Sequence, residues 1–376
     1  MKRAREYLQT QKPEQSIYID GGAWLRGPML GKGGFGSVHV ALFPNPKPRF
    51  KDYPSVLAVK STDTFTSAEL IMEKRLLDHL GQSPFIIRCF GQDVTVSDKD
   101  GRWRLNIFLE YASGGSLADL IRKREGLGLL ESQVRRYTRT ILEGLELIHR
   151  KGFVHCDLKP ANVLLVSDRD GFVAKIADLG LAKRANSRQG KSARGTRMYL
   201  SPEAVTQGIQ EKPSDIWALG CVVLGMLTGE KPWSNCKRLK KHELMRKIAT
   251  ETPALPSGIS KEAEDFLLKC FARNPDNRPT AEMLLSHPFL WGSDIEDGSF
   301  QEPEENLTLC LSKAAFEDSK AAFEDSYFIP LGGSSFGGGG GGGGEEEEDS
   351  TGFAPEMILP LAVMYPAGYK RRAILR

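Results

Sequence analysis

The chain lacks the features that mark a membrane protein or a general nucleic-acid binder. Its 51 lysines and arginines nearly balance its 48 aspartates and glutamates, so the net charge is only +3 over 376 residues. A general nucleic-acid binder carries a large basic excess, which is missing from this composition. The longest strongly apolar stretch, residues 216–227, is too short to span a bilayer. We therefore expect neither nucleic acid nor a membrane among its partners.

The chain also lacks cysteine pairs. Its six cysteines are scattered at Cys89, Cys156, Cys221, Cys236, Cys270 and Cys310. No two of them have the C-x-x-C spacing of zinc and redox sites, so a reducing compartment is the simpler interpretation. Residues 1–15 have no apolar core of the kind found in a secretory signal. These absences predict a soluble protein of the cytoplasm, the nucleus or both.

One short segment concentrates polar groups at a spacing suited to phosphoryl transfer. Residues 155–162 read HCDLKPAN, and Asp178-Leu179-Gly180 places a second carboxylate 21 residues after Asp157. Phosphoryl transfer needs a base for the hydroxyl proton, a cation facing the moving phosphate and two oxygen ligands for Mg²⁺. This spacing is far more specific than any single glycine motif.

A glycine-rich segment lies upstream of this loop. Residues 30–38 read LGKGGFGSV, which predicts a strand, a glycine turn and a second strand. Gly31, Gly33 and Gly36 would let backbone N–H groups approach phosphates. The pattern alone also fits a dinucleotide fingerprint, but a helix follows the glycines there and a strand is predicted here. A Walker A loop is excluded because no Gly-Lys-Ser/Thr closes the motif.

Predicted strands come before predicted helices along the chain. The strand predictions are residues 30–38 (around the glycine turn), 56–60, 86–96 and 102–110, with a proline-rich hairpin loop at 43–48. Helical spacing of apolar residues appears at 67–80, 116–124, 131–151, 215–228, 261–272 and 280–286. This order predicts an α+β fold with two lobes.

Over about residues 24–291 the chain resembles the eukaryotic protein kinase family. The resemblance implies a bilobal fold, with a small β-rich N-lobe, a larger α-helical C-lobe, and ATP with Mg²⁺ between them. The DLKPAN form is similar to the serine/threonine-specific branch. The domain prediction is a flexible N-terminal segment at residues 1–23, a protein kinase domain at 24–291 and a largely disordered tail at 292–376.

The resemblance also implies roles for individual residues. Asp157 would be the catalytic base, Lys159 would face the γ-phosphate, and Asn162 and Asp178 would hold Mg²⁺. The residues expected to bind the nucleotide lie on the glycine turn, the strands that follow, one helix and the linker between lobes. They are Leu30, Gly31, Gly33, Gly36, Val38, Ala58, Lys60, Glu73, Glu110, Ala112 and Asp178.

Three of these assignments carry alternatives. Lys60 would contact the α- and β-phosphates and pair with a helix carboxylate, but it could also be an ordinary surface lysine. Glu73 is the preferred partner, although Glu69 lies one turn earlier on the same helix face. The backbone of Glu110 and Ala112 would bond the adenine, or this segment is simply a strand end.

The chain departs from the family at Cys156, where most kinases have an arginine. In the family that arginine binds a phosphorylated residue of the activation segment, and a thiol cannot make this charge-assisted contact. We therefore predict activity that depends less on phosphorylation of that segment, with Cys156 as a buried packing residue. Leu179 replaces the more common phenylalanine, a change that keeps an apolar side chain.

The activation segment, residues 178–203, is basic and has no acid between its ends. Its candidate phosphate acceptors are Ser187, Ser192 and Thr196, and a structural role is favoured for the last. Further predictions come from the family pattern and concern single contacts. They are hydrogen bonds from Thr196 to Asp157 and Lys159, a buried ion pair of Glu203 with Arg278, anchoring of the catalytic loop backbone by Asp215, and a structural role for His155.

The narrower resemblance is to plant mitogen-activated protein (MAP) kinase kinase kinases of the MEKK type. It rests on GTRMYLSPEAV at residues 195–205, DIWALGCVV at 215–223 and LTGEKPW at 227–233. It implies that the protein substrate is a MAP kinase kinase. The terminal KRRAIL, residues 370–375, resembles a docking peptide for MAP kinases, and a nuclear-import signal fits it equally well.

The tail before this end has a repetitive composition. Residues 313–319 repeat directly as 320–326, and a glycine run at 337–344 precedes an acidic run at 345–349. Two copies of seven residues are too few for a solenoid. A segment of this composition buries too little apolar surface to compensate the entropy that it would lose on ordering, so we predict that the tail is disordered.

Two other classes of function stay open. A pseudokinase scaffold would keep the fold and bind partners without turnover, but Lys60, Asp157 and Asp178 are all present. A kinase-like enzyme acting on a small molecule would not need the Gly195-Thr196 and 201–203 elements, which resemble a binding loop for protein substrates.

Overall fold

The computed structural model describes most of residues 18–291. The described ranges are 18–20, 23–33, 36–43, 47–62, 68–96, 103–124, 126–169, 171–187, 193–234 and 240–291. Most of the flexible segment predicted at residues 1–23 lies outside these ranges, although Tyr18–Asp20 form a strand, and so does the tail at 292–376, with its repeat and its basic end.

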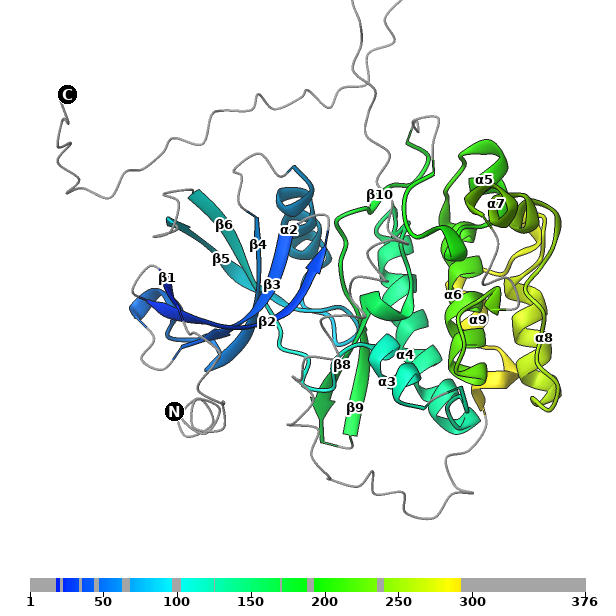
Figure 1. Cartoon of the computed structure of the whole chain (residues 1–376), viewed down its shortest axis with the longest axis horizontal. Coiled ribbons are helices and arrows are strands. Elements are labelled where there is room, and N and C mark those ends of the chain that lie inside the picture. The colour runs from blue at the N-terminus through cyan, green and yellow to red at the C-terminus, as the bar shows by residue number, and fades with distance from the viewer. Residues whose placement is uncertain are drawn as a thin grey trace, which may run out of the picture. The chain divides into compact units, whose positions relative to one another are not determined.

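The N-terminal half forms one antiparallel sheet with a single helix. The strand order is β1-β2-β3-β4-β6-β5, and Figure 1 shows helix α2 beside this sheet. The bounds are β1 (Tyr18–Asp20), β2 (Trp24–Gly33), β3 (Gly36–Leu42), β4 (Val56–Thr62), α2 (Ala68–Leu80), β5 (Cys89–Val96) and β6 (Trp103–Leu109). The glycine turn is the tip of the β2–β3 hairpin, where Gly33 pairs with Gly36.

The proline-rich connection between β3 and β4 does more than lengthen a hairpin. It contains the short helix η1 (Pro48–Phe50), and Phe50 and Tyr53 pack in an aromatic cluster with Phe43 and Phe108. Its ring pairs meet mostly edge to face, which is the favoured geometry for aromatic side chains. The connection therefore helps to fix the sheet that carries the glycine turn.

The C-terminal half is mainly helical, with short strands around the catalytic loop. The helices are α3 (Leu117–Lys123), α4 (Glu131–Arg150), α5 (Pro202–Gln207), α6 (Lys212–Thr228), α7 (Lys241–Thr250), α8 (Lys261–Cys270) and α9 (Ala281–Leu285). The strands are β7 (Phe153–Val154), β8 (Val163–Asp168), β9 (Gly171–Ile176) and β10 (Lys183–Arg184). Short 3-10 helices are η2 (Pro160–Asn162), η3 (Arg197–Tyr199), η5 (Pro275–Asn277) and η6 (Pro288–Trp291). The α+β fold with a β-rich N-lobe and a helical C-lobe is confirmed.

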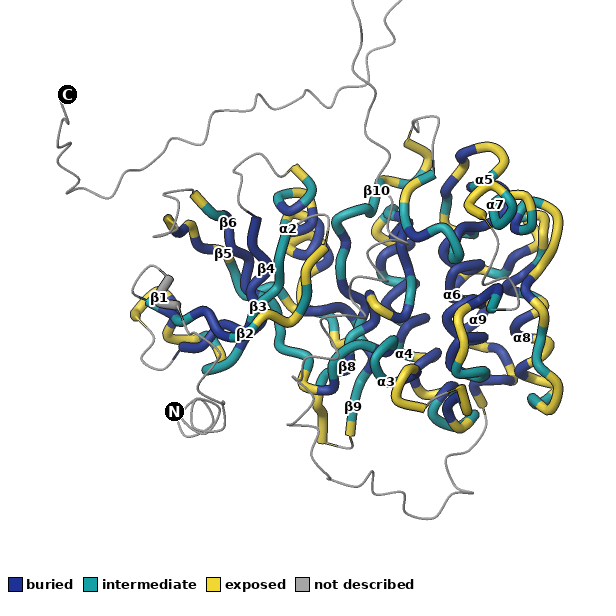
Figure 2. Tube along the Cα trace, viewed as in Figure 1, coloured by how far each residue is buried: buried dark blue, intermediate teal, exposed yellow. Residues whose placement is uncertain are grey.

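Helix α6 runs through the centre of the C-lobe core. Every residue from Ser214 to Met226 is buried, and Figure 2 shows the helix in dark blue along most of its length. A helix that is apolar on all sides needs such a position. No helix in the described ranges is both long and apolar enough to cross a membrane. Because α6 is fixed on all sides, the residues at its start can act as anchors for the loops above it.

Candidate active site

The catalytic loop, residues 155–162, is fastened to the first turn of α6. The backbone N–H groups of His155 and Cys156 donate to the two carboxylate oxygens of Asp215, at 2.8 and 3.0 Å. Nε2 of His149 lies 2.8 Å from the same carboxylate. Burial raises the pKa of Asp215, but the hydrogen bonds from His149 and from the loop backbone outweigh it and hold the pKa below its usual value. The predicted anchoring role of Asp215 is confirmed.

Cys156 is buried inside this anchored turn. Its backbone has a φ of +67°, and its thiol donates to the carbonyl of Val154 over 3.6 Å. Burial raises the pKa of the thiol, so the sulfur stays protonated and unreactive. The prediction of a packing cysteine at this position is confirmed.

Asp157 lies among hydrogen-bond donors from two segments. One of its oxygens accepts from the backbone N–H of Thr196 at 2.8 Å. The other accepts from Nδ2 of Asn162 at 3.1 Å and lies 2.9 Å from Nζ of Lys159. Lys159 also donates to the hydroxyl of Thr196 at 2.7 Å. The predicted contacts of Thr196 are confirmed, with the backbone rather than the hydroxyl facing Asp157.

His155 holds the loop in shape. Nε2 of its buried ring lies 3.2 Å from the carbonyl of Ala177, and the N–H of Asp157 donates to Nδ1 at 3.2 Å. The two contacts assign the proton to Nε2, because a carbonyl can only accept. Both ring nitrogens are therefore used within the fold, as the structural role predicted for His155 requires.

Lys60 links the two lobes. Its ammonium on β4 lies 2.7 Å from Oε2 of Glu73 on α2 and 2.8 Å from Oδ1 of Asp178, which follows β9. Of the two candidate helix carboxylates, Glu73 is therefore the partner of Lys60. Burial raises the pKa of Asp178, but the charge of Lys60 and its hydrogen bond hold it below the usual value. Asp178 stays ionised, as a metal ligand must be.

The glycine turn leaves open space above β2 and β3. A Cβ atom added to Gly31 or Gly33 would meet no atom of the described residues within 4 Å. At Gly36, with a φ of +124°, an added Cβ would lie 2.0 Å from the carbonyl oxygen of Ser61. Glycine is thus sterically required at Gly36 and leaves the backbone uncovered at the other two positions. Residues 34–35, at the tip, lie outside the described ranges.

The remaining predicted nucleotide contacts surround this space and the linker. Leu30 is 37% exposed, Val38 is half-buried and Ala58 is buried. In the linker, the N–H of Glu110 donates to the carbonyl of Arg88 at 2.9 Å, and the carbonyl of Ala112 accepts from Gly115 at 3.1 Å. The Glu110 side chain is held 2.8 Å from the ammonium of Lys175. Within the described part of the chain, the carbonyl of Glu110 and the N–H of Ala112 have no such partner and could bond an adenine ring.

The donors proposed for Mg²⁺ are an amide and a carboxylate. Nδ2 of Asn162 donates to the carbonyl and to the carboxylate of Asp157, so its amide oxygen points away from that residue. The N–H of Ala177 donates to the carbonyl of Asn162 at 2.8 Å, which brings Asp178 next to the loop. No group of three His, Cys, Asp or Glu side chains with metal-site geometry occurs in the described ranges. An Asp–Asn pair still fits Mg²⁺, which takes a few protein oxygens and completes its shell with phosphates and water.

The end of the activation segment is fixed by a buried ion pair. The guanidinium of Arg278 makes two contacts of 2.7 Å with the carboxylate of Glu203. Burial raises the pKa of Glu203, but Arg278 outweighs it and holds the pKa below its usual value. The predicted ion pair is confirmed.

Sequence reasoning missed two residues next to this site. Gln210 and Glu211 stand directly before α6 and contact the activation segment at Arg194, Lys183 and Asn186. Nothing in the local sequence distinguishes them from solvated polar residues ahead of a helix. Their position five and four residues before the anchoring Asp215 was the only available signal.

Comparison with known proteins gives one consistent result. Residues 24–290 match the family model for the protein kinase domain. The chain is 43% identical over 307 residues to mitogen-activated protein kinase kinase kinase 20 of Arabidopsis thaliana, which covers 78% of this chain and 87% of the relative. Mitogen-activated protein kinase kinase kinase 17 of the same plant is 39% identical over 270 residues, 71% of this chain and 69% of the relative. Mitogen-activated protein kinase kinase kinase A of Dictyostelium discoideum is 36% identical over 297 residues, 77% of this chain but 30% of the relative.

Proposed function

The chain belongs to the protein kinase family, and we propose that it transfers the γ-phosphate of ATP to serine and threonine residues of a MAP kinase kinase. The observation that carries this proposal is the contact set around Asp157. The base, the cation at Lys159 and the substrate-side residue Thr196 are already within hydrogen-bond distance of one another. The similarity to MAP kinase kinase kinases supports the choice of substrate class.

The residues around the lobe junction fit ATP with Mg²⁺. Lys60, held by Glu73 and Asp178, presents its charge where phosphates would lie below the uncovered glycine backbone. The carbonyl of Glu110 and the N–H of Ala112 would bond the adenine. Asp178 and the amide oxygen of Asn162 would hold Mg²⁺, which supplies charge neutralisation to the phosphates when bound.

The role of Asp157 follows from its surroundings. Its carboxylate is oriented by hydrogen-bond donors from Thr196 and Asn162. The side chain therefore loses little conformational entropy when it binds a substrate hydroxyl. As an oriented acceptor it takes the hydroxyl proton, and Lys159 stabilises the negative charge of the group in transfer. Thr196 places the substrate-binding end of the activation segment against this pair.

Two further proposals concern the C-terminal end of the chain, which lies outside the described ranges, and the location of the protein in the cell. The basic and apolar end at residues 370–375 docks a MAP kinase, and the protein acts in the cytoplasm, the nucleus or both. Both proposals rest on the sequence alone, and a truncation ending at residue 291 tests the docking proposal by co-precipitation.

The test is ³²P transfer from ATP to a kinase-dead MAP kinase kinase, with casein and free serine as further acceptors. The wild type should label serine and threonine of the protein acceptors and leave free serine unlabelled. Asp157→Asn should lower kcat by about 10²–10⁴ and keep nucleotide binding, because it removes the base but no nucleotide contact. Nucleotide binding without transfer by the wild type would instead support a scaffold.

A further inference from the structure

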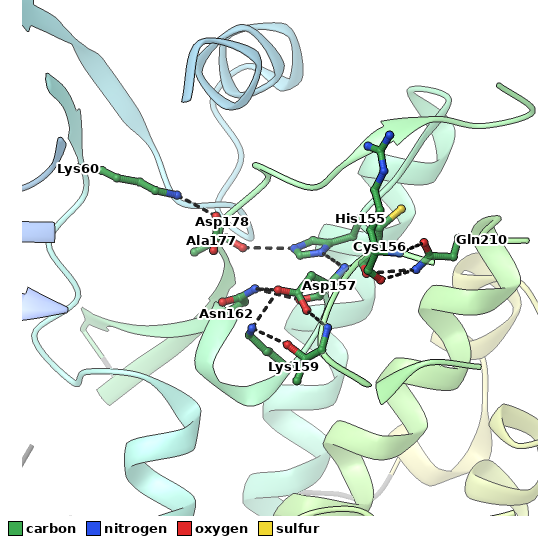
Figure 3. A network of polar contacts seen from close by, with 11 residues as sticks. Lys60, His155, Cys156, Asp157, Lys159, Asn162, Ala177, Asp178 and Gln210 are labelled. Atoms are coloured by element: carbon green, nitrogen blue, oxygen red, sulfur yellow. Dashed lines mark hydrogen bonds and ion pairs between the residues drawn. The ribbon is translucent and has the colours of Figure 1, made fainter. Parts of the chain in front are cut away.

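Two adjacent residues hold the activation segment at two separate points. Gln210 is buried, and its carboxamide forms a paired contact with the backbone of Arg194. Oε1 accepts from the Arg194 N–H at 2.7 Å, and Nε2 donates to the Arg194 carbonyl at 2.9 Å. Nε2 also lies 3.4 Å from the carbonyl of Cys156, so one amide joins the segment to the catalytic loop (Figure 3).

Glu211 holds the opposite part of the segment. Its Oε1 lies 2.7 Å from the ammonium of Lys183, and its Oε2 accepts from the backbone N–H of Asn186 at 3.0 Å. The Lys183 side chain is 7% exposed and that of Glu211 is 27% exposed, so the pair is partly screened from water. Asn186 has a φ of +59°, and its N–H bond to Glu211 supports this left-handed turn.

Arg194 is connected to the reacting groups through the next two residues of the chain. Gly195 follows with a φ of +97°, and a Cβ there would lie 2.5 Å from the carbonyl of Cys156. Thr196 comes next and contacts Asp157 and Lys159. The path from Gln210 to Asp157 therefore runs through three consecutive residues that are pressed against the catalytic loop.

The chain itself supplies a counter-ion for a cation near Cys156. A phosphorylated segment is ordered when its phosphate meets a cluster of cations. Charged groups of both signs act on the Cys156 thiol, among them the cations Lys183 and Arg194 and the anions Glu211 and Asp215. Lys183 already has a carboxylate partner within the chain. Among the described residues, Lys183 therefore needs no phosphate as its counter-ion.

We propose that Gln210 and Glu211 are positioning residues that keep the activation segment in its substrate-accepting arrangement without phosphorylation. Glu211 takes the place of the phosphate as the counter-ion of Lys183. The neutral amide of Gln210 links the backbone of Arg194 to the catalytic loop. It does so beside Cys156, whose side chain carries no positive charge that could bind a phosphate. The proposal rests on the proposed function, because it concerns how the same site meets its protein substrate.

The test uses the full chain freed of phosphate, with its unmodified mass verified before each assay. Glu211→Gln keeps the size of the side chain and an acceptor for Asn186 but removes the charge paired with Lys183. It should lower kcat/KM for the kinase-dead MAP kinase kinase about five- to tenfold and leave KM for ATP unchanged. Glu146→Gln is the matched control, since it removes an exposed i,i+4 pair with Arg150 on α4 and should have no effect.

A charge exchange separates positioning from a general loss of structure. Lys183→Glu alone should be more impaired than Glu211→Gln, because it sets two carboxylates against each other, and the double variant Lys183→Glu/Glu211→Lys should recover at least half of the kcat/KM lost in Lys183→Glu. Amide hydrogen exchange should rise in Glu211→Gln for peptides covering residues 183–187 and remain at the wild-type level in α6. Recovery together with this local change supports the proposal.

Other outcomes overturn it, and they are distinct from failure of the proposed function. Wild-type kcat/KM in Glu211→Gln, or no recovery in the double variant, overturns the positioning role while transfer itself persists. A wild type that transfers phosphate only after its activation segment is phosphorylated also overturns it. Absence of transfer to any protein acceptor in both phosphorylation states is instead a failure of the proposed function.

Discussion

The catalytic loop and the activation segment are both fastened at the start of α6, but by different kinds of contact. The catalytic loop is held by Asp215, a buried carboxylate whose oxygens accept hydrogen bonds from two backbone N–H groups and contact the ring of His149. The activation segment is held by the neutral amide of Gln210 and by the carboxylate of Glu211, whose side chain is 27% exposed. The buried anchors Asp215 and Gln210 cannot be removed without leaving unpaired polar groups, whereas the partly exposed Glu211 can be exchanged. The catalytic loop is therefore firmly fixed, and the part of the segment that Glu211 holds is the part that substitution or modification can alter.

The largest effect is expected where the buried anchor is weakened. Asp215→Asn replaces one acceptor oxygen by an NH₂ group that faces donors from His155, Cys156 or His149. We expect a loss of about 3–5 kcal/mol in the free energy of unfolding, because buried donors are left unpaired and a buried charge is lost. Chemical denaturation measures the stability, and kcat should fall with it. Wild-type stability would show that the catalytic loop does not depend on this carboxylate.

The ion pair at the end of the segment should give an asymmetric result. Arg278→Met leaves the carboxylate of Glu203 buried without its cation, with the Ser214 hydroxyl still donating to it at 2.9 Å, and should cost about 3–5 kcal/mol of unfolding free energy. Glu203→Gln should cost less, because Arg278 keeps carbonyl contacts to Ala272 and Pro213 at 2.8 and 3.0 Å. Denaturation of both single variants and the double variant measures the coupling. Equal costs for the two single changes would contradict this account.

A smaller effect is expected at the neutral anchor of the segment. Gln210→Glu keeps the shape of the side chain but turns a donor into an acceptor that faces the carbonyls of Arg194 and Cys156. We expect kcat/KM for the protein substrate to fall about tenfold, with KM for ATP unchanged. Gln207→Glu, a change at the exposed last residue of α5, three positions earlier in the chain, is the control. A fall in ATP affinity of the same size would indicate disruption of the whole lobe.

The smallest effect is expected at Cys156 itself. Cys156→Ser keeps a small side chain that can still donate to the carbonyl of Val154. Because the buried thiol stays protonated and touches no reacting group, kcat should stay within about twofold of the wild type. Steady-state kinetics with the phosphate-free enzyme measures this. A large loss would show that the sulfur has a role that its contacts do not reveal.

The sequence predicted the parts of the molecule that depend on local spacing. The catalytic loop, the glycine hairpin, α4 and α6 were all visible as motifs or as helical periodicity. Short α5 was missed because six residues are too few for a periodic pattern. Glu69 and Glu73 could not be separated on one helix face, and only the packing of α2 against the sheet brings Glu73 to Lys60.

Gln210 and Glu211, which hold the activation segment, could not be predicted from the sequence for a different physical reason. Gln210 and Glu211 contact residues 16 to 28 positions away, through a chain path whose shape is set by tertiary packing. A polar pair ahead of a helix has the same appearance in sequence whether it is solvated or buried. Asp215 could be predicted only because its family pattern is strong.

One measurement tests the central claim most directly. The initial rate of transfer to a kinase-dead MAP kinase kinase is compared for the phosphate-free full chain and for the same preparation after stoichiometric phosphorylation of its activation segment. If Gln210 and Glu211 already hold the segment in place, the active population is near its maximum and the rate should change by less than about threefold. A rise of about a hundredfold would contradict the account, because it would mean that the segment is ordered by the phosphate and not by the chain.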